Sequence, residues 1–306
     1  MNMTRRQFTQ ATLATIVGQD AILSYDMAAN SRLRLAICNE TFPNWKLADV
    51  CNNIKRLGYE GVEVMPATLS DDPVTLPNAE RANLRRAMAS EGIAYVGLHA
   101  VLSAPKGLHI TTPDEIVRRR SWEYVRRLLE LSADLGEGGV MVFGSAKQRS
   151  TTNGASVKDA VKRFTEGLAG MADAAGQRNI TLLIEPLAPR LSNVVNTLAE
   201  AVAMAREINH PAVQTMFDTH NTAAETLPHD ELLKKYRAHI RHVHLNEMDG
   251  RHPGAGNYDF KTPLRALREI GYRGWVSVEV FDFAPGGEKI AADSLQFLRA
   301  QAPFSK

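Results

Sequence analysis

Four side chains that can bind a metal ion stand at the ends of strand-like runs in the second half of the chain. They are Glu185, Asp218, His244 and Glu279, at the ends of the apolar runs 181–184, 213–217, 242–245 and 275–278. They lie 33, 26 and 35 residues apart, close to the length of one strand–helix repeat. Alternate residues of a strand share a face, so His242 should point the same way as His244.

Three carboxylates and one imidazole form a ligand set that suits Mn²⁺, Mg²⁺ or Co²⁺, and catalytic Zn²⁺ is an alternative. Any one of these residues alone would equally be a salt bridge or a helix cap. The four together, at the spacing of consecutive barrel strands, favour one divalent metal site.

A metal in such a site acts as a Lewis acid on a carbonyl or vicinal hydroxyl oxygen and stabilises an enediolate. Glu185 and Glu279 would lie on either side of the substrate as general base and general acid. The sequence leaves open which of the two faces which sugar carbon.

Short apolar runs alternate with segments of helical period from residue 32 onward, which is typical of repeated βα units. The other four expected strands are 33–38, 61–65, 94–99 and 138–143. The expected helices are 46–57, 78–91, 113–135, 156–177, 197–208, 229–236, 262–270 and 288–300. We therefore predict an α/β fold with a single (β/α)8 TIM barrel over residues 31–306, whose active site lies at the carboxyl ends of its strands.

The first 30 residues resemble a twin-arginine export signal. Arg5 and Arg6 are followed by Phe8, a mildly apolar stretch over 11–22 and small residues at 28–29. The stretch is too short and too polar for a permanent membrane span. We predict a periplasmic or exported protein; a disordered leader or an amphipathic helix is the alternative, and would leave the protein in the cytoplasm.

Composition is that of an ordinary globular protein. The chain has 306 residues, 44% hydrophobic and 23% charged, with a net charge of +2, which argues against nucleic acid or an acidic membrane surface as a partner. Two cysteines, Cys38 and Cys51, are too few for a disulfide framework or a Cys-rich zinc site, and we expect buried thiols.

The chain resembles the xylose isomerase-like TIM barrels, also called the sugar phosphate isomerase/epimerase superfamily, over about residues 33–300. Its segment 242–256, HVHLNEMDGRHPGAG, is similar to the corresponding stretch of the ketose 3-epimerases. The resemblance implies that Glu185 and Glu279 are metal ligands and the catalytic acid/base pair, with Asp218 and His244 as the other ligands. It also implies that Arg251, or Gly250 with a shift of one residue, stands where those enzymes hold substrate oxygens.

One position departs from the family pattern. The epimerases have Asp-x-x-His after their sixth strand, whereas this chain reads Asp218-Thr219-His220-Asn221. Either His220 reaches the substrate through a local bulge, or Asn221 makes the contact without a titratable group.

Other residues are candidates for substrate binding. Lys147, Arg149 and Arg190 could bind an anionic group, and Asn193 could bind substrate or orient Glu185. Phe42, Trp45 and Phe281 could offer apolar faces to a sugar ring. The remaining candidates at strand ends and in the loop after the seventh strand are Glu63, His99 and Glu247.

We expect a metal-dependent isomerase or epimerase of an unphosphorylated ketose or keto-sugar, and a 3-keto-glycoside lyase of the same superfamily is the main alternative. A phosphodiesterase similar to the apurinic endonucleases would need more metal ligands and a basic surface. A binding module without catalysis would not need both Glu185 and Glu279. The expected partner is a small sugar or keto-glycoside, and a homo-oligomer is possible for this group of barrels.

Overall fold

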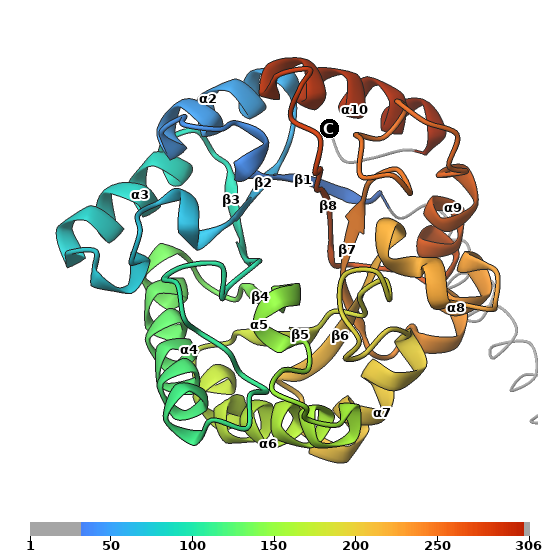
Figure 1. Cartoon of the computed structure of the whole chain (residues 1–306). Coiled ribbons are helices and arrows are strands. Elements are labelled where there is room, and N and C mark those ends of the chain that lie inside the picture. Colours follow the sequence, from blue (N-terminus) through green and yellow to red (C-terminus); the bar gives the residue numbers. More distant parts are fainter. Residues whose placement is uncertain (1–31, 303–306) are drawn as a thin grey trace, which may run out of the picture.

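A closed ring of eight parallel strands lies at the centre of the protein in a computed structural model, which describes residues 32–302 (Figure 1). Each strand pairs with its neighbours in sequence, and β1 closes the ring by pairing with β8. The strands are β1 (Arg34–Cys38), β2 (Gly61–Val64), β3 (Ala94–Leu98), β4 (Val140–Phe143), β5 (Thr181–Ile184), β6 (Val213–Asp218), β7 (Ile240–Leu245) and β8 (Trp275–Val278). The predicted (β/α)8 barrel is confirmed, with strand limits that differ from the expected ones by one or two residues.

Helices surround the ring in chain order, except the short α5, which Figure 1 shows within the ring next to β4 and β5. The helices are α2 (Leu47–Leu57), α3 (Asn78–Ser90), α4 (Glu115–Leu135), α5 (Ala146–Arg149), α6 (Val157–Gly176), α7 (Leu198–Ile208), α8 (His229–Tyr236), α9 (Lys261–Glu269) and α10 (Gly287–Gln301). The short α5 was not predicted, because four residues are too few to show helical period. Short 3-10 turns follow three strands at the rim: η1 (Asn39–Thr41) follows β1, η2 (Pro66–Thr68) follows β2 and η4 (Thr219–Ala224) follows β6, while η3 (Pro73–Thr75) precedes α3.

Local signals fix where the helices begin. Asp114 caps α4 by accepting hydrogen bonds from the backbone of Ile116 and Val117. Thr197 and Glu200 form a capping box at the start of α7, as the sequence indicates. These caps set the lengths of the loops that precede the helices, and those loops form the rim of the barrel.

Apolar side chains pack on both faces of the sheet, but the interior of the barrel is only partly apolar. The main core lies between strands and helices, and a small separate cluster is formed by Val142, Leu183 and Met216 of β4, β5 and β6. On the side of β2 and β7, Glu63 and His242 are fully buried instead. Buried charge needs partners, so this side of the interior is built to hold polar groups.

The proposed export signal, residues 1–30, lies outside the described residues. Within residues 32–302, no helix combines the length and the apolar character that crossing a membrane requires.

Candidate metal centre and active site

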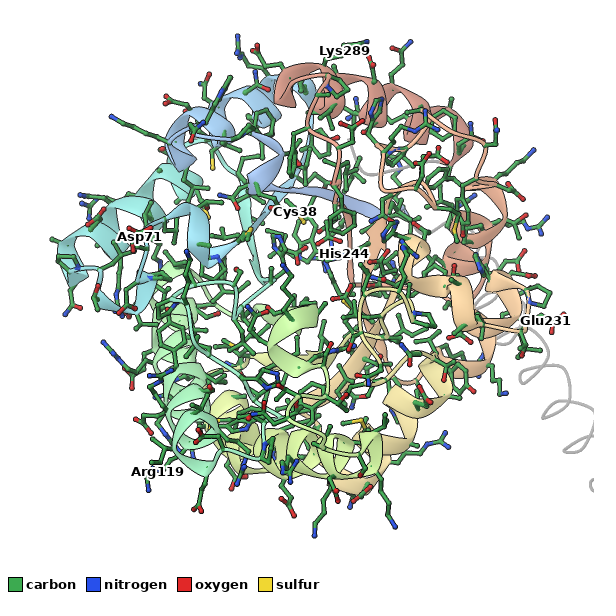
Figure 2. All side chains as sticks on the ribbon, in the orientation of Figure 1. Cys38, Asp71, Arg119, Glu231, His244 and Lys289 are labelled. Carbon is green, nitrogen blue, oxygen red and sulfur yellow. The ribbon has the colours of Figure 1, made fainter. Side chains whose placement is uncertain are left out.

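The four residues singled out by strand spacing meet at one point of the rim. Glu185, Asp218, His244 and Glu279 each offer one ligand atom, and these atoms all lie within 4.8 Å of one another. All four side chains are buried. Figure 2 shows His244 near the middle of the barrel, well inside the ring of helices. The arrangement follows from topology, because successive parallel strands of a closed barrel bring their carboxyl ends to one rim.

The electrostatics of this group favour a divalent cation. Burial, and then the charges of Glu279 and Asp218, raise the pKa of Glu185 well above its usual range. Burial and Glu279 also raise the pKa of Asp218. Several carboxylates in one buried site cannot all ionise without a compensating positive charge. A divalent cation would supply that charge. The donor set of three carboxylates and one imidazole therefore fits a divalent metal ion.

Glu279 behaves differently from Glu185. Burial disfavours its charged form, but the neighbouring His244 outweighs burial and lowers the pKa of Glu279. His244 Nδ1 lies 3.1 Å from Glu279 Oε2. Burial likewise disfavours a charged His244, yet Glu279 and Glu63 together raise its pKa well above the ordinary value. The two catalytic candidates, Glu185 and Glu279, thus have pKa values that are shifted in opposite directions.

Glu63 supports His244 from below the rim. Its Oε1 accepts from His244 Nε2 at 3.0 Å and its Oε2 from His242 Nε2 at 2.7 Å. A carboxylate behind a metal-binding histidine fixes which ring nitrogen faces the metal. The predicted substrate contact of Glu63 is therefore corrected, because both carboxylate oxygens are occupied and the side chain is fully buried. The shared face of His242 and His244 is confirmed.

The side chain of Asn221 contacts the ligand carboxylates, whereas His220 reaches Asp218 Oδ1 only through its backbone N–H, at 2.8 Å. Asn221 Nδ2 donates to Asp218 Oδ2 at 2.7 Å and to Glu185 Oε1 at 3.2 Å, and its Oδ1 accepts from the backbone of Ala188. Residues 219–224 form the 3-10 turn η4, which brings Asn221 back over the end of β6. The register irregularity between β6 and β7 lies upstream, between Thr215 and Phe217, so it does not move His220 into the ligand group.

His220 lies at the mouth of the barrel with two other candidates. Its ring contacts the guanidinium of Arg190 and packs on Phe281, with 4.8 Å between ring centroids. Phe281 is 51% exposed and Trp45 is 39% exposed, whereas Phe42 is buried beneath Trp45. Arg190, His220 and Phe281 thus form a polar and aromatic group at the turn η4, which follows Asp218.

Two loop residues predicted to bind substrate are engaged within their own loop. Glu247 accepts hydrogen bonds from the backbone of Gly254 and Tyr258, which closes the loop after β7. Arg251 pairs with Asp249 at 2.8 Å and donates to the carbonyl of Ala255. Both residues therefore shape this loop. Glu247 supplies acceptors for backbone N–H groups, and Arg251 supplies a donor for a backbone carbonyl.

Three further candidates lie in the segments after β4 and β5. Asn193 bonds with Thr151. Lys147 is exposed on α5. Arg149 is 1% exposed and donates to three backbone carbonyls, those of Phe143, Val194 and Val195. The predicted anion contact of Arg149 is wrong, because a guanidinium that ties two loops together in the interior is not available to a ligand.

Gly144, directly after β4, leaves space for the carboxylate of Glu185. A Cβ atom at Gly144 would lie 1.8 Å from Glu185 Oε2, far inside van der Waals contact. The carboxylate therefore lies against bare backbone, which only glycine permits.

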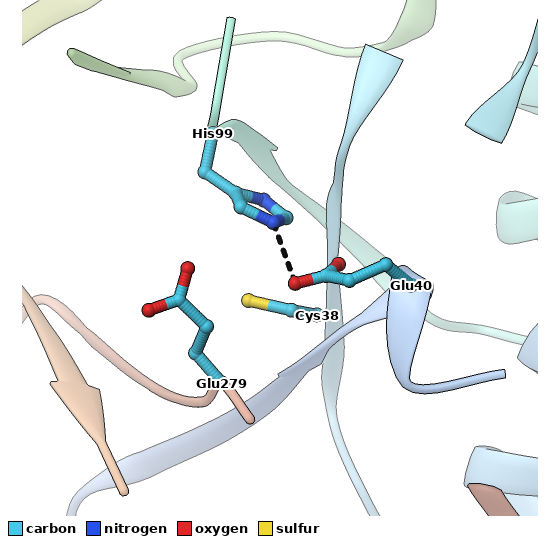
Figure 3. A group of neighbouring side chains, drawn as sticks. All are labelled: Cys38, Glu40, His99 and Glu279. Atoms are coloured by element: carbon cyan, nitrogen blue, oxygen red, sulfur yellow. Dashed lines mark hydrogen bonds and ion pairs between the residues drawn. The ribbon is translucent and has the colours of Figure 1, made fainter. Parts of the chain in front are cut away.

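Two residues of the site were not recognised in the sequence. Glu40, in η1, lies 2.8 Å from His99 Nε2 through its Oε1, and Cys38 ends β1 beside them (Figure 3). Burial and the charges of Glu63, Glu40 and Glu279 raise the pKa of the Cys38 thiol well above its usual value. Glu40 stands two positions after the end of β1, in the turn η1, whereas Glu185 and Glu279 directly follow their strands, so strand-end spacing alone does not single out Glu40.

Comparison with known proteins assigns the chain to a family. Residues 51–301 match the xylose isomerase-like TIM barrel family. A probable ketose 3-epimerase of Synechocystis is 24% identical, with 82% of this chain and 89% of that protein covered. D-psicose 3-epimerase of Agrobacterium fabrum is 26% identical, with 77% of this chain and 80% of that protein covered. The 3-dehydro-D-guloside 4-epimerase of Escherichia coli is 25% identical, with 87% of this chain and 99% of that protein covered.

Solved structures share the fold. A D-psicose 3-epimerase determined in the presence of D-fructose superposes with a TM-score of 0.76 at 22% identity, covering 88% of this chain and 99% of that one. The apo 3-keto-D-glucoside 4-epimerase of Escherichia coli gives a TM-score of 0.75 at 22% identity, covering 88% and 100%. Because the family match covers residues 51–301, most of the length of this chain, the chain belongs to the xylose isomerase-like TIM barrels.

Proposed function

We propose that the protein is a divalent-metal-dependent sugar epimerase or isomerase that transfers a proton at a carbon next to a ketone. One observation carries the proposal: Glu185 and Glu279 enter a single ligand group from the ends of β5 and β8, with ligand atoms within 4.8 Å of one another. Two carboxylates that face one bound substrate from different strands can serve as proton acceptor and proton donor.

The ligand group fits Mn²⁺, Co²⁺ or Mg²⁺, with Zn²⁺ as an alternative, because it offers three carboxylates and one imidazole. When bound, such an ion supplies Lewis-acid polarisation of substrate oxygens and offsets the negative charge of an enediolate. Glu63 and Asn221 hold His244, Asp218 and Glu185 in place for this role.

The two glutamates take separate roles in this mechanism. The ionised Glu279 takes the proton from the carbon next to the ketone, and the protonated Glu185 returns one from the other side of the substrate. A proton that leaves one face and arrives on the opposite face inverts the configuration of that carbon, which is epimerisation.

The substrate proposed is an unphosphorylated keto-sugar. Relatives of the chain are named for a ketose, for D-psicose and for a 3-dehydro-D-guloside. Export through residues 1–30 would support this choice, because phosphorylated sugars are normally kept inside the cell. Phe281 and Trp45 offer exposed aromatic surface for the apolar face of a sugar ring.

A 3-keto-glycoside lyase is the second candidate, because one relative is named for a 3-dehydro-D-guloside, which has both a ketone and a glycosidic bond. A glutamate removes the proton next to the ketone. The electron pair of that C–H bond forms a carbon–carbon double bond as the glycosidic C–O bond breaks, and the leaving oxygen takes up a proton from the other glutamate or from water to become an alcohol. Asn221 holds the carboxylates of Asp218 and Glu185 for the first step and has no titratable proton for the second.

Proton NMR in D₂O tests the two reactions together. The full chain, loaded with Mn²⁺ or Co²⁺ in parallel samples, is incubated with a free ketohexose and separately with a 3-keto-glucoside; each mixture is freed of metal and diluted before its spectrum is recorded. Deuterium next to the ketone together with a new epimer or isomer supports the first proposal. Release of the aglycone with an unsaturated or hydrated keto-sugar supports the lyase. No exchange with either substrate by metal-loaded protein contradicts both substrate classes.

A further inference from the structure

A second group of potential metal ligands lies on the other side of Glu279. Cys38, Glu40, His99 and Glu279 each offer one ligand atom, and these atoms lie within 4.8 Å of one another. Figure 3 shows the Cys38 sulfur between the carboxylates of Glu279 and Glu40, with the His99 ring beside them. This group comes from the ends of β1, β3 and β8, whereas the first comes from the ends of β5 to β8.

The orientation of His99 is that of a metal ligand. Its Nε2 faces the group, 2.8 Å from Glu40 Oε1, and its Nδ1 lies 3.6 Å from Glu63 Oε1. Glu63 Oε1 is the same atom that accepts from the outer nitrogen of His244. Histidines that bind metals turn their other ring nitrogen toward a carboxylate in this way. Glu63 therefore lies behind both imidazoles, hydrogen-bonded to His244 and in ion-pair contact with His99.

Polar atoms of the second group lack partners. Glu40 Oε2 and His99 Nδ1 are buried and make no hydrogen bond within the described residues, although His99 Nδ1 has the ion-pair contact with Glu63. His99 is only 1% exposed. Buried polar atoms are rarely left without a partner, so an unsatisfied carboxylate oxygen beside a thiol and an imidazole favours a cation-binding site.

The two cysteines are in contrasting surroundings. Cys51 is part of the apolar core beneath α2, where a buried thiol is expected. Cys38 is equally buried but is surrounded by the carboxylates of Glu40, Glu63 and Glu279. A thiol placed among carboxylates gains nothing from apolar packing, whereas a metal ion would bind both kinds of group.

We propose that Cys38, Glu40, His99 and Glu279 bind a second divalent cation, of the borderline class of Zn²⁺ and Co²⁺. A sulfur and a nitrogen donor favour such ions over Mg²⁺ and Mn²⁺, which suit the oxygen-rich first group. Binding replaces the thiol proton, which passes to solvent, by a metal–sulfur bond. Glu279 belongs to both groups, and two-metal sites of enzymes hold their ions about 3.5–4 Å apart. The inference does not depend on which reaction the protein catalyses.

Cobalt binding to the full, metal-free chain tests the second site without any substrate. Wild-type protein equilibrated with excess Co²⁺ and then desalted should retain about two equivalents, measured by elemental analysis. It should also show a near-ultraviolet thiolate-to-cobalt charge-transfer band. Cys38→Ser should lose the band and about one equivalent, and His99→Gln should lose about one equivalent as well.

Two control variants make the result specific. Cys51→Ser removes the other buried thiol and should keep both the band and both equivalents. Asp218→Asn weakens the first group only and should lower the bound cobalt while keeping the band. Circular dichroism of each variant shows that it is folded, and His99→Gln keeps the test decisive should Cys38→Ser fail to fold.

The outcomes separate this inference from the proposed function. One equivalent without a thiolate band, or a band that survives in Cys38→Ser, overturns the second site and makes Glu40 and His99 a hydrogen-bonded pair only. One equivalent with a band that Cys38→Ser abolishes supports the second site while contradicting the first group, and with it the proposed mechanism. No retained cobalt contradicts both.

Discussion

At the scale of single residues, Glu185 and Glu279 have different neighbours, which supports the proposed division of roles between them. His244 Nδ1 lies 3.1 Å from Glu279 Oε2 and, outweighing burial, lowers the pKa of Glu279 in the metal-free protein. Burial, and then the charges of Glu279 and Asp218, raise the pKa of Glu185. The same side-chain type can thus have different proton affinities within one site.

Substitution of Glu279 by Gln should abolish deuterium exchange next to the ketone, with a loss of about 10²- to 10⁴-fold or more in rate. Sugar binding, measured by calorimetry, should change much less, because the amide keeps the shape of the side chain. Glu130→Gln, on the exposed face of α4, is the matched control. Full activity in Glu279→Gln would show that the acid/base assignment is wrong.

Asn221→Ala removes two hydrogen bonds to ligand carboxylates and should weaken metal binding about 10- to 100-fold, the usual cost of losing such a supporting residue. The measurement is competition with a chelator of known affinity. Asn193→Ala is the control, because the contacts of Asn193 are with Thr151. Equal affinities of the two variants would mean that Asn221 does not support the ligand group.

At the scale of elements, the ends of strands and the turns after them determine the site. β5 to β8 each contribute one ligand, and the turn η4 after β6 adds Asn221. Gly144, directly after β4, leaves the space that the Glu185 carboxylate occupies. Elements that carry no functional side chain therefore still decide where Glu185 can lie.

Gly144→Ala tests this contribution of β4. The added methyl group would meet Glu185 Oε2 at 1.8 Å, so Glu185 must move and the variant should lose most of its metal affinity and activity. Gly170→Ala in α6 meets nothing within 4 Å and serves as the control, with unchanged or slightly higher stability. Metal titration and thermal melting of both variants make the comparison. Wild-type metal affinity in Gly144→Ala would contradict the close approach.

At the scale of the whole molecule, buried charge links stability to pH. Burial disfavours a charged His99, but Glu40 and Glu63 outweigh it and raise the pKa of His99 from 6.5 to about 9. Because the folded pKa is higher than the unfolded one, the stabilisation is fully present below pH 6.5 and is lost as the pH rises through about 9. It amounts to at most about 3 kcal/mol.

Metal-free protein should therefore become less stable between pH 6.5 and pH 9, as measured by urea unfolding. His99→Gln should show a flatter profile over this range, whereas His210→Gln, which removes a partly exposed histidine, should keep the wild-type slope. A slope that is the same in His99→Gln and in wild type would assign the pH dependence to other groups.

Apolar periodicity and strand-end residues were enough to predict the barrel, because each βα unit carries its own local pattern. The same rule predicted that Glu185, Asp218, His244 and Glu279 converge, since parallel strands of a closed barrel end at one rim. Helix limits were predicted to within two residues. The short helix α5 and the buried position of Arg149 were not, because neither has a local signal.

What the sequence by itself determined was the fold and the set of residues at the rim. Only the tertiary structure decided their partners: Glu63 with His242 and His244, Glu40 with His99, and Asn221 with Asp218 and Glu185. The first of these joins residues separated by 179 positions in the chain. Periodicity fixes which way a side chain points within its element, but contacts between elements depend on the closure of the barrel and on the paths of its loops, which no local pattern records.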